Sequence, residues 1–79
     1  MKVFDYQCQI HEVDENGNII QTLAQLNGFG PAKAAFEAYA VSKSHCWLQF
    51  RERMRVVETV RTGAYDMETG KVEIVERSV

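Results

Sequence analysis

Apolar and polar residues alternate near the start of the chain, from Phe4 to His11. The apolar positions are Phe4, Tyr6, Cys8 and Ile10, and polar residues separate them. A period of two indicates a strand with one buried face. The segment DENGN, residues 14–18, follows, and an Asn-Gly pair between two β-rich runs is a strong hairpin signal. We therefore predict a hairpin whose return strand, IIQTLAQL, runs from about Asn18 to Leu26.

A helical pattern follows this hairpin. Gly30 is the expected N-cap, and Pro31 suits the first turn because its missing N–H would have no partner there. The segment AKAAFEAYAVSK has high helix propensity. Its apolar residues fall on one stripe, which consists of Ala32, Ala35, Phe36, Tyr39 and Ala40. We therefore predict one amphipathic helix of about three turns, from Pro31 to about Lys43.

Strand patterns return from His45 onward. The segment HCWLQF places Cys46, Leu48 and Phe50 on one side and Trp47, Gln49 and Arg51 on the other. RERM is the expected turn, with Glu52-Arg53 at its tip. It has no Gly, Asn or Pro, so a single long bent strand is the alternative. RVVETVRTGAY and KVEIVERS are two further strands, separated by a DMETG turn that Gly70 ends.

The predicted element order is β-β-α-β-β-β. A right-handed crossover after the second strand places the third strand beside the first. The sheet would then be antiparallel with strand order 2-1-3-4-5, and the helix would cover one face. This is an α+β domain of two layers. Residues 1–79 are predicted to form a single domain, because no linker or repeat interrupts them.

Composition places the chain among ordinary globular domains, with 46% hydrophobic and 25% charged residues. The net charge of −2 is unevenly distributed, because residues 46–63 are locally basic and both ends are acidic. A dedicated nucleic-acid binder is usually basic over its whole surface. We therefore disfavour direct nucleic-acid binding, although the basic strip could supplement a DNA contact made mainly by a partner.

The amino-terminal segment has no apolar core of the kind found in a signal peptide. No apolar run approaches the ~20 residues that a membrane span requires. Cys8 and Cys46 are too few for a disulfide framework. We therefore expect a cytoplasmic protein that has no membrane contact and two reduced thiols.

Cys8, His11, His45 and Cys46 carry the right atoms for zinc, but their spacing on strands points them to opposite faces. We expect buried thiols and surface imidazoles, and therefore neither a metal nor an exposed nucleophile. Glutamates alternate with arginines along the strands, which indicates cross-strand charge pairs. The segment NGFGPAK lacks the spacing of a phosphate-binding loop. The sequence thus predicts no cofactor and no enzymatic activity.

The sheet face opposite the helix is the remaining candidate site. Its predicted residues are Val3, Gln7, Gln9, His11, Trp47, Gln49 and Arg51. A tryptophan beside arginines has two interpretations: a solvated cation–π pair or an interface, where both residue types are enriched. For the interface, the predicted partner-binding residues are Trp47, Arg51, Arg53, Arg55, Arg61 and Lys71.

The block PAKAAFEAYAVSKSHCWLQFRERMRVVETVR resembles small single-domain proteins encoded by bacteriophages and integrated mobile elements in proteobacteria. Those proteins often combine an A-A-F-E-A helix, a short strand, a charged turn and an R-V-V or R-V-I strand. The β-β-α-β-β-β order is also similar to that of several type I anti-CRISPR proteins. The resemblance implies a phage-type inhibitor that binds a type I CRISPR effector complex in the host cytoplasm and blocks target DNA binding or cleavage. It assigns no binding residue.

Two alternatives to this inhibitor remain. One is a small nucleic-acid-associated or regulatory protein, whose affinity would fall steeply with salt. The other is a self-associating domain. A homodimer through the open face, or through the second or fifth strand at a sheet edge, is compatible with every one of these functions.

Overall fold

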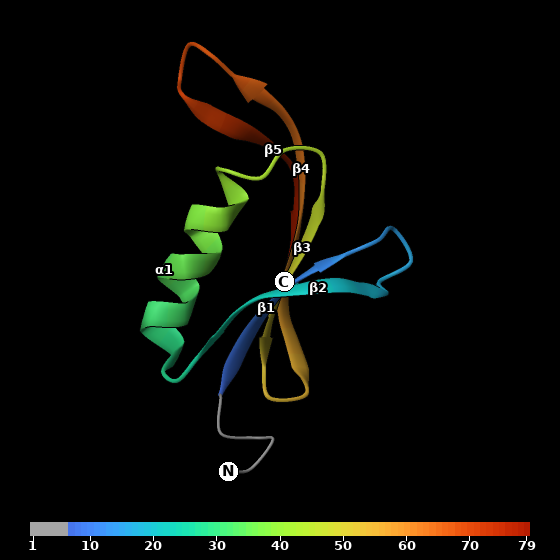
Figure 1. The fold of residues 1–79 in the computed structure, drawn as a ribbon, viewed down its shortest axis with the longest axis vertical. Helices are drawn as coiled ribbons and strands as arrows, with labels where there is room; N and C mark the ends of the chain where they lie inside the picture. The colour runs from blue at the N-terminus through green and yellow to red at the C-terminus, as the bar shows by residue number, and fades with distance from the viewer. Residues whose placement is uncertain (1–6) are drawn as a thin grey trace.

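The computed structural model describes residues 7–79, which form a five-stranded antiparallel sheet with one helix along one face (Figure 1). The elements are β1 (Cys8–Val13), β2 (Ile19–Leu26), α1 (Phe29–Ala40), β3 (Trp47–Glu52), β4 (Arg55–Asp66) and β5 (Lys71–Ser78). The strand order is β2-β1-β3-β4-β5. The predicted α+β class, element order and strand order are confirmed. Within the described residues, no helix is long and apolar enough to cross a membrane.

The hydrophobic core lies between α1 and the sheet. Phe36 of the helix stacks on Phe50 of β3 with ring centroids 5.5 Å apart, and Phe29 packs on Phe50 at 5.3 Å. The buried cluster consists of Cys8, Ile10, Ala32, Phe36, Ala40, Cys46, Leu48, Phe50 and Val60. The alternation of apolar and polar residues therefore correctly predicted that Cys8, Ile10, Cys46, Leu48 and Phe50 face the helix. Phe4 and Tyr6 of the predicted first strand, and Val3 of the predicted open face, lie outside the described residues.

A buried carboxylate fastens α1 to the last two strands. The side chain of Glu58 on β4 is only 2% exposed and forms ion pairs with Lys33 of the helix and Arg77 of β5. Glu58 faces the helix because a bulge at Val57 shifts the β3–β4 register, so that Phe50 lies opposite Glu58 and Arg51 opposite Val56. The predicted cross-strand pairing holds for Glu52 with Arg55, for Glu58 with Arg77 and for Glu76 with Arg61. Glu58 has a further partner outside the sheet, Lys33 of the helix.

The helix begins two residues before Pro31, and its N-cap is Gly28 rather than the predicted Gly30. Gly28 has a φ of 98°, a backbone conformation that glycine adopts without steric cost. The helix ends at Ala40 rather than Lys43. The chain then turns, with Lys43 N–H donating to the carbonyl of Tyr39.

The β3–β4 connection is a two-residue turn, so the bent-strand alternative is wrong. Glu52 pairs with Arg55, which places Arg53 and Met54 at the tip instead of Glu52 and Arg53. Arg53 has a left-handed φ of 57°, a position where glycine or asparagine is usual. The predicted Asn-Gly hairpin and the turn before Gly70 are both present. The β4–β5 hairpin extends beyond the helix at the top of Figure 1.

Candidate partner-binding face

The sheet face opposite α1, here called the open face, consists of three rows of residues that lie opposite one another on neighbouring strands. Residues opposite each other in a ladder share a face. The first row contains Ile19, Val13, Trp47, Arg61 and Glu76. The second row contains Thr22, His11, Gln49, Thr59 and Ser78. The third row contains Gln25, Gln9, Arg51 and Val56.

Trp47 and Arg61 form the centre of the first row. The Arg61 guanidinium lies 5.5 Å from the centroid of the Trp47 ring, a cation–π contact. The strand register produces this contact, because Trp47 and Arg61 are directly opposite on β3 and β4. Arg61 is also near Glu76, with 3.8 Å between Nε and Oε1. Both charged side chains of this pair are about half exposed.

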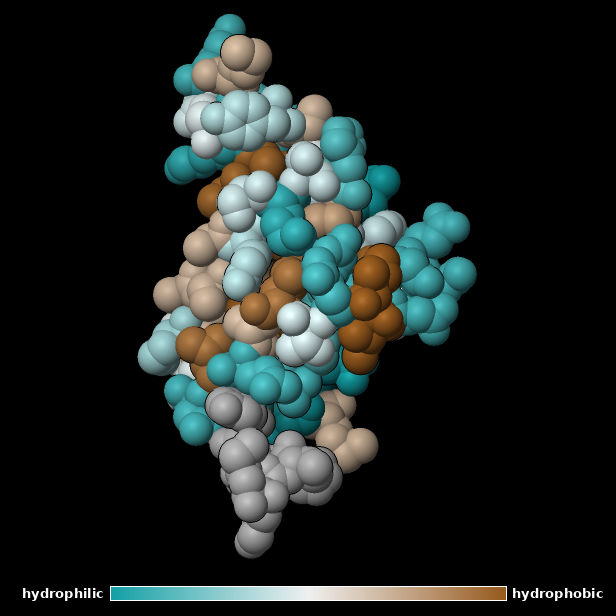
Figure 2. Space-filling view, viewed as in Figure 1, coloured by the Kyte–Doolittle hydropathy of each residue, from teal (hydrophilic) through white to brown (hydrophobic). Residues whose placement is uncertain are grey.

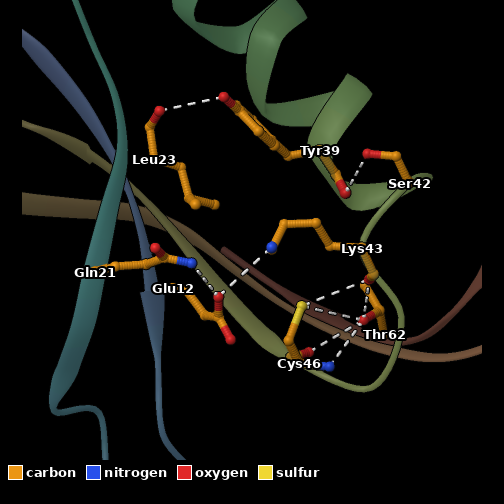
Figure 3. A network of polar contacts seen from close by, with 8 residues as sticks. All are labelled: Glu12, Gln21, Leu23, Tyr39, Ser42, Lys43, Cys46 and Thr62. Carbon is orange, nitrogen blue, oxygen red and sulfur yellow. Dashed lines mark hydrogen bonds and ion pairs between the residues drawn. The ribbon is translucent and has the colours of Figure 1, made fainter.

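The loop before β3 fixes the position of Trp47. Thr62 is buried, and its hydroxyl accepts a hydrogen bond from the Cys46 N–H at 3.0 Å and donates one to the Lys43 carbonyl at 2.6 Å (Figure 3). His45 adopts a left-handed φ of 53°, and its N–H donates to the Gly63 carbonyl. These bonds hold the loop against β4, so Trp47 enters the sheet with a defined orientation.

A shallow pocket of about 230 Å³ lies beside the Trp47–Arg61 pair. Its lining residues are His45, Cys46, Trp47, Arg61 and Thr62. The sequence analysis did not assign His45 or Thr62 to this site. No glycine or asparagine signals the turn at His45, and the burial of Thr62 depends on the path of the loop. A second hollow, of about 370 Å³, lies in the β4–β5 hairpin by Tyr65 and Met67, away from Trp47.

His11 is buried, with 4% of its surface exposed, so the predicted surface position of this imidazole is wrong. It lies on β1, which is paired on both sides, between Gln49 of β3 and Thr22 of β2 in the second row. Its Nδ1 is 3.1 Å from the Thr22 hydroxyl. Burial lowers the pKa of His11, and the Arg51 guanidinium lowers this pKa further. The imidazole is therefore neutral at pH 7 and forms part of the floor of the open face.

Three of the six predicted binding residues lie on the open face. Trp47 and Arg61 are in contact, and Arg51 lies four residues further along β3, in the third row. Arg51 is half-buried, and its Nε donates to the side-chain oxygen of Gln49 at 3.2 Å. These two arginines give the face a positive charge on both sides of the Gln49 position.

The other three predicted residues lie elsewhere. Arg55 is opposite Glu52 in the row that includes Cys8, and this row faces the helix. Its Nη2 pairs with Glu52 Oε1 at 2.7 Å. Arg53 lies at the tip of the β3–β4 turn. Lys71 is opposite Asp66, next to the β4–β5 turn. The structure therefore divides the arginine-rich segment between two faces and a turn.

The cysteine side chains are free and buried. Burial raises the pKa of the Cys8 thiol, and the nearby charge of Glu52 raises it further. A raised pKa keeps this thiol protonated, which is the opposite of an activated nucleophile. Among residues 7–79, no three His, Cys, Asp or Glu side chains are grouped so that they could hold a metal ion.

Comparisons of the chain with models of protein families, with curated proteins and with solved structures find no match. The face is accordingly interpreted from its own residues: a tryptophan held by a cation–π contact, two arginines and a shallow polar pocket.

Proposed function

We propose that this chain is a non-enzymatic protein-binding module that recognises a partner through Trp47, Arg61 and Arg51, here called the recognition patch. The observation that carries the proposal is the Trp47–Arg61 contact on the open face. Tryptophan and arginine are the residues most enriched in binding hot spots. An exposed cation–π contact contributes roughly 0.5–1 kcal/mol, and a partner that removes water from it would strengthen it to about 2 kcal/mol.

The chemistry of the patch favours an acidic partner surface. Arg61 lies 3.8 Å from Glu76, longer than the roughly 2.7–2.9 Å of a charge-assisted hydrogen bond, so its donors are available to a second carboxylate. The pocket beside Trp47 gives such a carboxylate a place next to the Arg61 guanidinium. An Asp or Glu side chain of the partner, inserted beside the indole ring, would fill this pocket and accept hydrogen bonds from the Arg61 guanidinium.

The resemblance to phage-encoded proteins narrows the proposal to a class of partner. We propose that the partner is a subunit of a type I CRISPR effector complex and that binding blocks target DNA binding or cleavage. The protein would then act as a stoichiometric inhibitor in the host cell. A rigid sheet face suits this role, because little conformational freedom is lost when it is covered.

The test is a binding titration with a purified type I effector complex, measured by biolayer interferometry and by inhibition of target DNA cleavage. Trp47→Ala should weaken binding by about 2 kcal/mol or more, roughly 30-fold in Kd, as expected for a hot spot. Tyr65→Ala is the matched control, because Tyr65 is an exposed aromatic residue outside the patch. It should bind like the wild type. Melting temperatures of both variants confirm that they fold.

Two results would contradict this function. If the wild-type chain does not bind type I complexes, the proposed partner class is wrong. If Trp47→Ala and Tyr65→Ala bind equally well, the recognition patch is misplaced.

The nucleic-acid alternative is tested by titrating the chain with duplex DNA at several salt concentrations. This alternative predicts an affinity for DNA that falls steeply with salt. The division of the arginines between two faces and a turn disfavours that alternative.

A further inference from the structure

The two edge strands of the sheet differ in charge. β2 is one edge and β5 is the other. The sequence of β2, IIQTLAQL, has no charged residue and no proline, and residues 16–32 around it are also uncharged. The charged residues of β5 are Lys71, Glu73, Glu76 and Arg77. Charges on an edge strand discourage it from pairing with another chain. Only β5 has this protection.

The first half of β2 is exposed and begins with two isoleucines. All four residues from Ile19 to Thr22 are exposed, with Ile19 at 51% and Ile20 at 60%. Figure 2 shows the corresponding brown patch over the start of β2. A bulge contributes to this exposure: Val13 pairs with Ile19 and Glu12 with Gln21, so Ile20 is the extra residue. The bulge places two aliphatic side chains together at the open edge.

The charged residue opposite Gln21 on β1, Glu12, is already compensated. Glu12 accepts a hydrogen bond from the Gln21 side chain at 2.9 Å and lies 3.7 Å from the Lys43 ammonium (Figure 3). On the second half of the strand, the Leu23 carbonyl accepts a hydrogen bond from the Tyr39 hydroxyl. The segment Ile19–Thr22 is thus the part of β2 that presents an exposed edge without an uncompensated charge.

We propose that Ile19–Thr22 pairs antiparallel with the same segment of a second copy of this chain, around a two-fold axis near Gln21. A two-fold contact places each residue near its own copy, so any charge close to the axis would meet its like. An uncharged segment avoids this penalty, and the two isoleucines of each copy bury against the other. The resulting dimer is one continuous sheet, with the recognition patches on β3 and β4 of both copies left open.

The oligomeric state tests this contact directly. Sedimentation velocity over a concentration series should show the wild-type chain shifting from monomer to dimer. Ile20→Lys should remain a monomer, because it places two ammonium groups near the axis. The matched control is Val75→Lys, which changes an exposed apolar residue of the other edge strand, 46% exposed, and should dimerise like the wild type. Circular dichroism checks that both variants fold.

A cross-link tests the same geometry without disturbing the strand. Gln21→Cys should form a disulfide-linked dimer under mild oxidation, whereas Val75→Cys should not, and the native thiols are buried. A wild-type chain that is monomeric at every concentration would overturn the proposal. Dissociation by Val75→Lys rather than Ile20→Lys, or equal cross-linking of both cysteine variants, would also overturn it. Trp47→Ala should still dimerise. The dimer contact is therefore tested by the oligomeric state and the recognition patch by partner binding, and either proposal can fail without the other.

Discussion

The two faces of the sheet use alternate residues of the same strands for different purposes. On the covered face, β3 contributes Leu48 and Phe50, which are fully buried against the helix. On the open face, the same strand contributes Trp47, Gln49 and Arg51, which are only half-buried. A small domain has few residues with which to build a core. The alternation lets one strand stabilise the fold on one side and present polar and aromatic groups on the other.

The ion pairs of the two faces also differ, both in the distance between the charged atoms and in the exposure of the side chains. On the covered face, Glu58 is almost completely buried and lies 2.7 Å from Arg77. On the open face, the Arg61–Glu76 separation is 3.8 Å and both side chains are about half exposed. Close, buried pairs fix the position of the helix. Loose, exposed pairs contribute little to stability and keep their donors free for a partner.

Removing a large side chain from the covered face should have the largest effect on stability. Phe50→Ala should lower the free energy of unfolding by about 3–5 kcal/mol, because it deletes a buried ring between Phe29 and Phe36. Gln49→Ala, the neighbouring residue on the open face, should cost less than about 1 kcal/mol. Urea unfolding followed by circular dichroism measures both values. Equal losses would show that the two faces do not divide their roles in this way.

Acid should weaken the covered face through Glu37. Arg77 binds the Glu37 carboxylate through two hydrogen bonds, at 2.6 and 2.9 Å, and Lys33 also contacts it. These contacts, the Arg77 bonds first, lower the pKa of Glu37 from 4.5 to about 2. Because the folded-state pKa is depressed, the stabilisation is fully present above pH 4.5 and is lost as the pH falls toward 2.

The control for this pH dependence is Glu37→Gln. This variant should be less stable than the wild type at pH 7 and should lose less stability between pH 4.5 and 2. Melting temperatures over that pH range measure the difference. Parallel curves for the two proteins would mean that Glu37 does not contribute through Arg77. Because the Glu37 side chain is 40% exposed, solvent screening should keep the effect well below that of Phe50→Ala.

A change on the open face should have the smallest effect on the stability of the fold. Arg61→Ala should cost about 0.5–1 kcal/mol of unfolding free energy, the contribution of an exposed cation–π contact. Trp47→Leu, which removes the aromatic ring, and both changes together complete a double-mutant cycle that isolates the contact. Thermal unfolding gives the four values. A coupling energy above about 2 kcal/mol would show that the pair is part of the core rather than a surface available for binding.

The sequence predicted the fold well because the alternation of residues such as Ile10 and Phe50 directly reports which face is buried. It was less informative where the backbone departs from regular geometry. The bulge at Val57 moved Glu58 to the covered face, and Arg53 adopted a left-handed turn without a glycine to signal it. These departures also determined that Arg55 lies beside Glu52 on the helix side.

The candidate site was predictable only in part, for related reasons. The alternation placed Trp47 and Arg51 on one face, but it could not show that Arg61 would be the residue directly opposite Trp47. The burial of His11 depends on its neighbours in adjacent strands, which a single strand's pattern does not contain. His45 joined the pocket through a left-handed turn that no local residue type indicated.

The central claim, that the open face binds the partner, can be tested at one atom, because Trp47 is the only tryptophan in the chain. Protein labelled with fluorotryptophan gives one fluorine NMR signal from this side chain. Addition of the unlabelled type I effector complex, at concentrations where binding is measured independently, should shift or broaden that signal. A signal that stays unchanged while the complex forms would show that the partner does not cover Trp47 and would contradict the account.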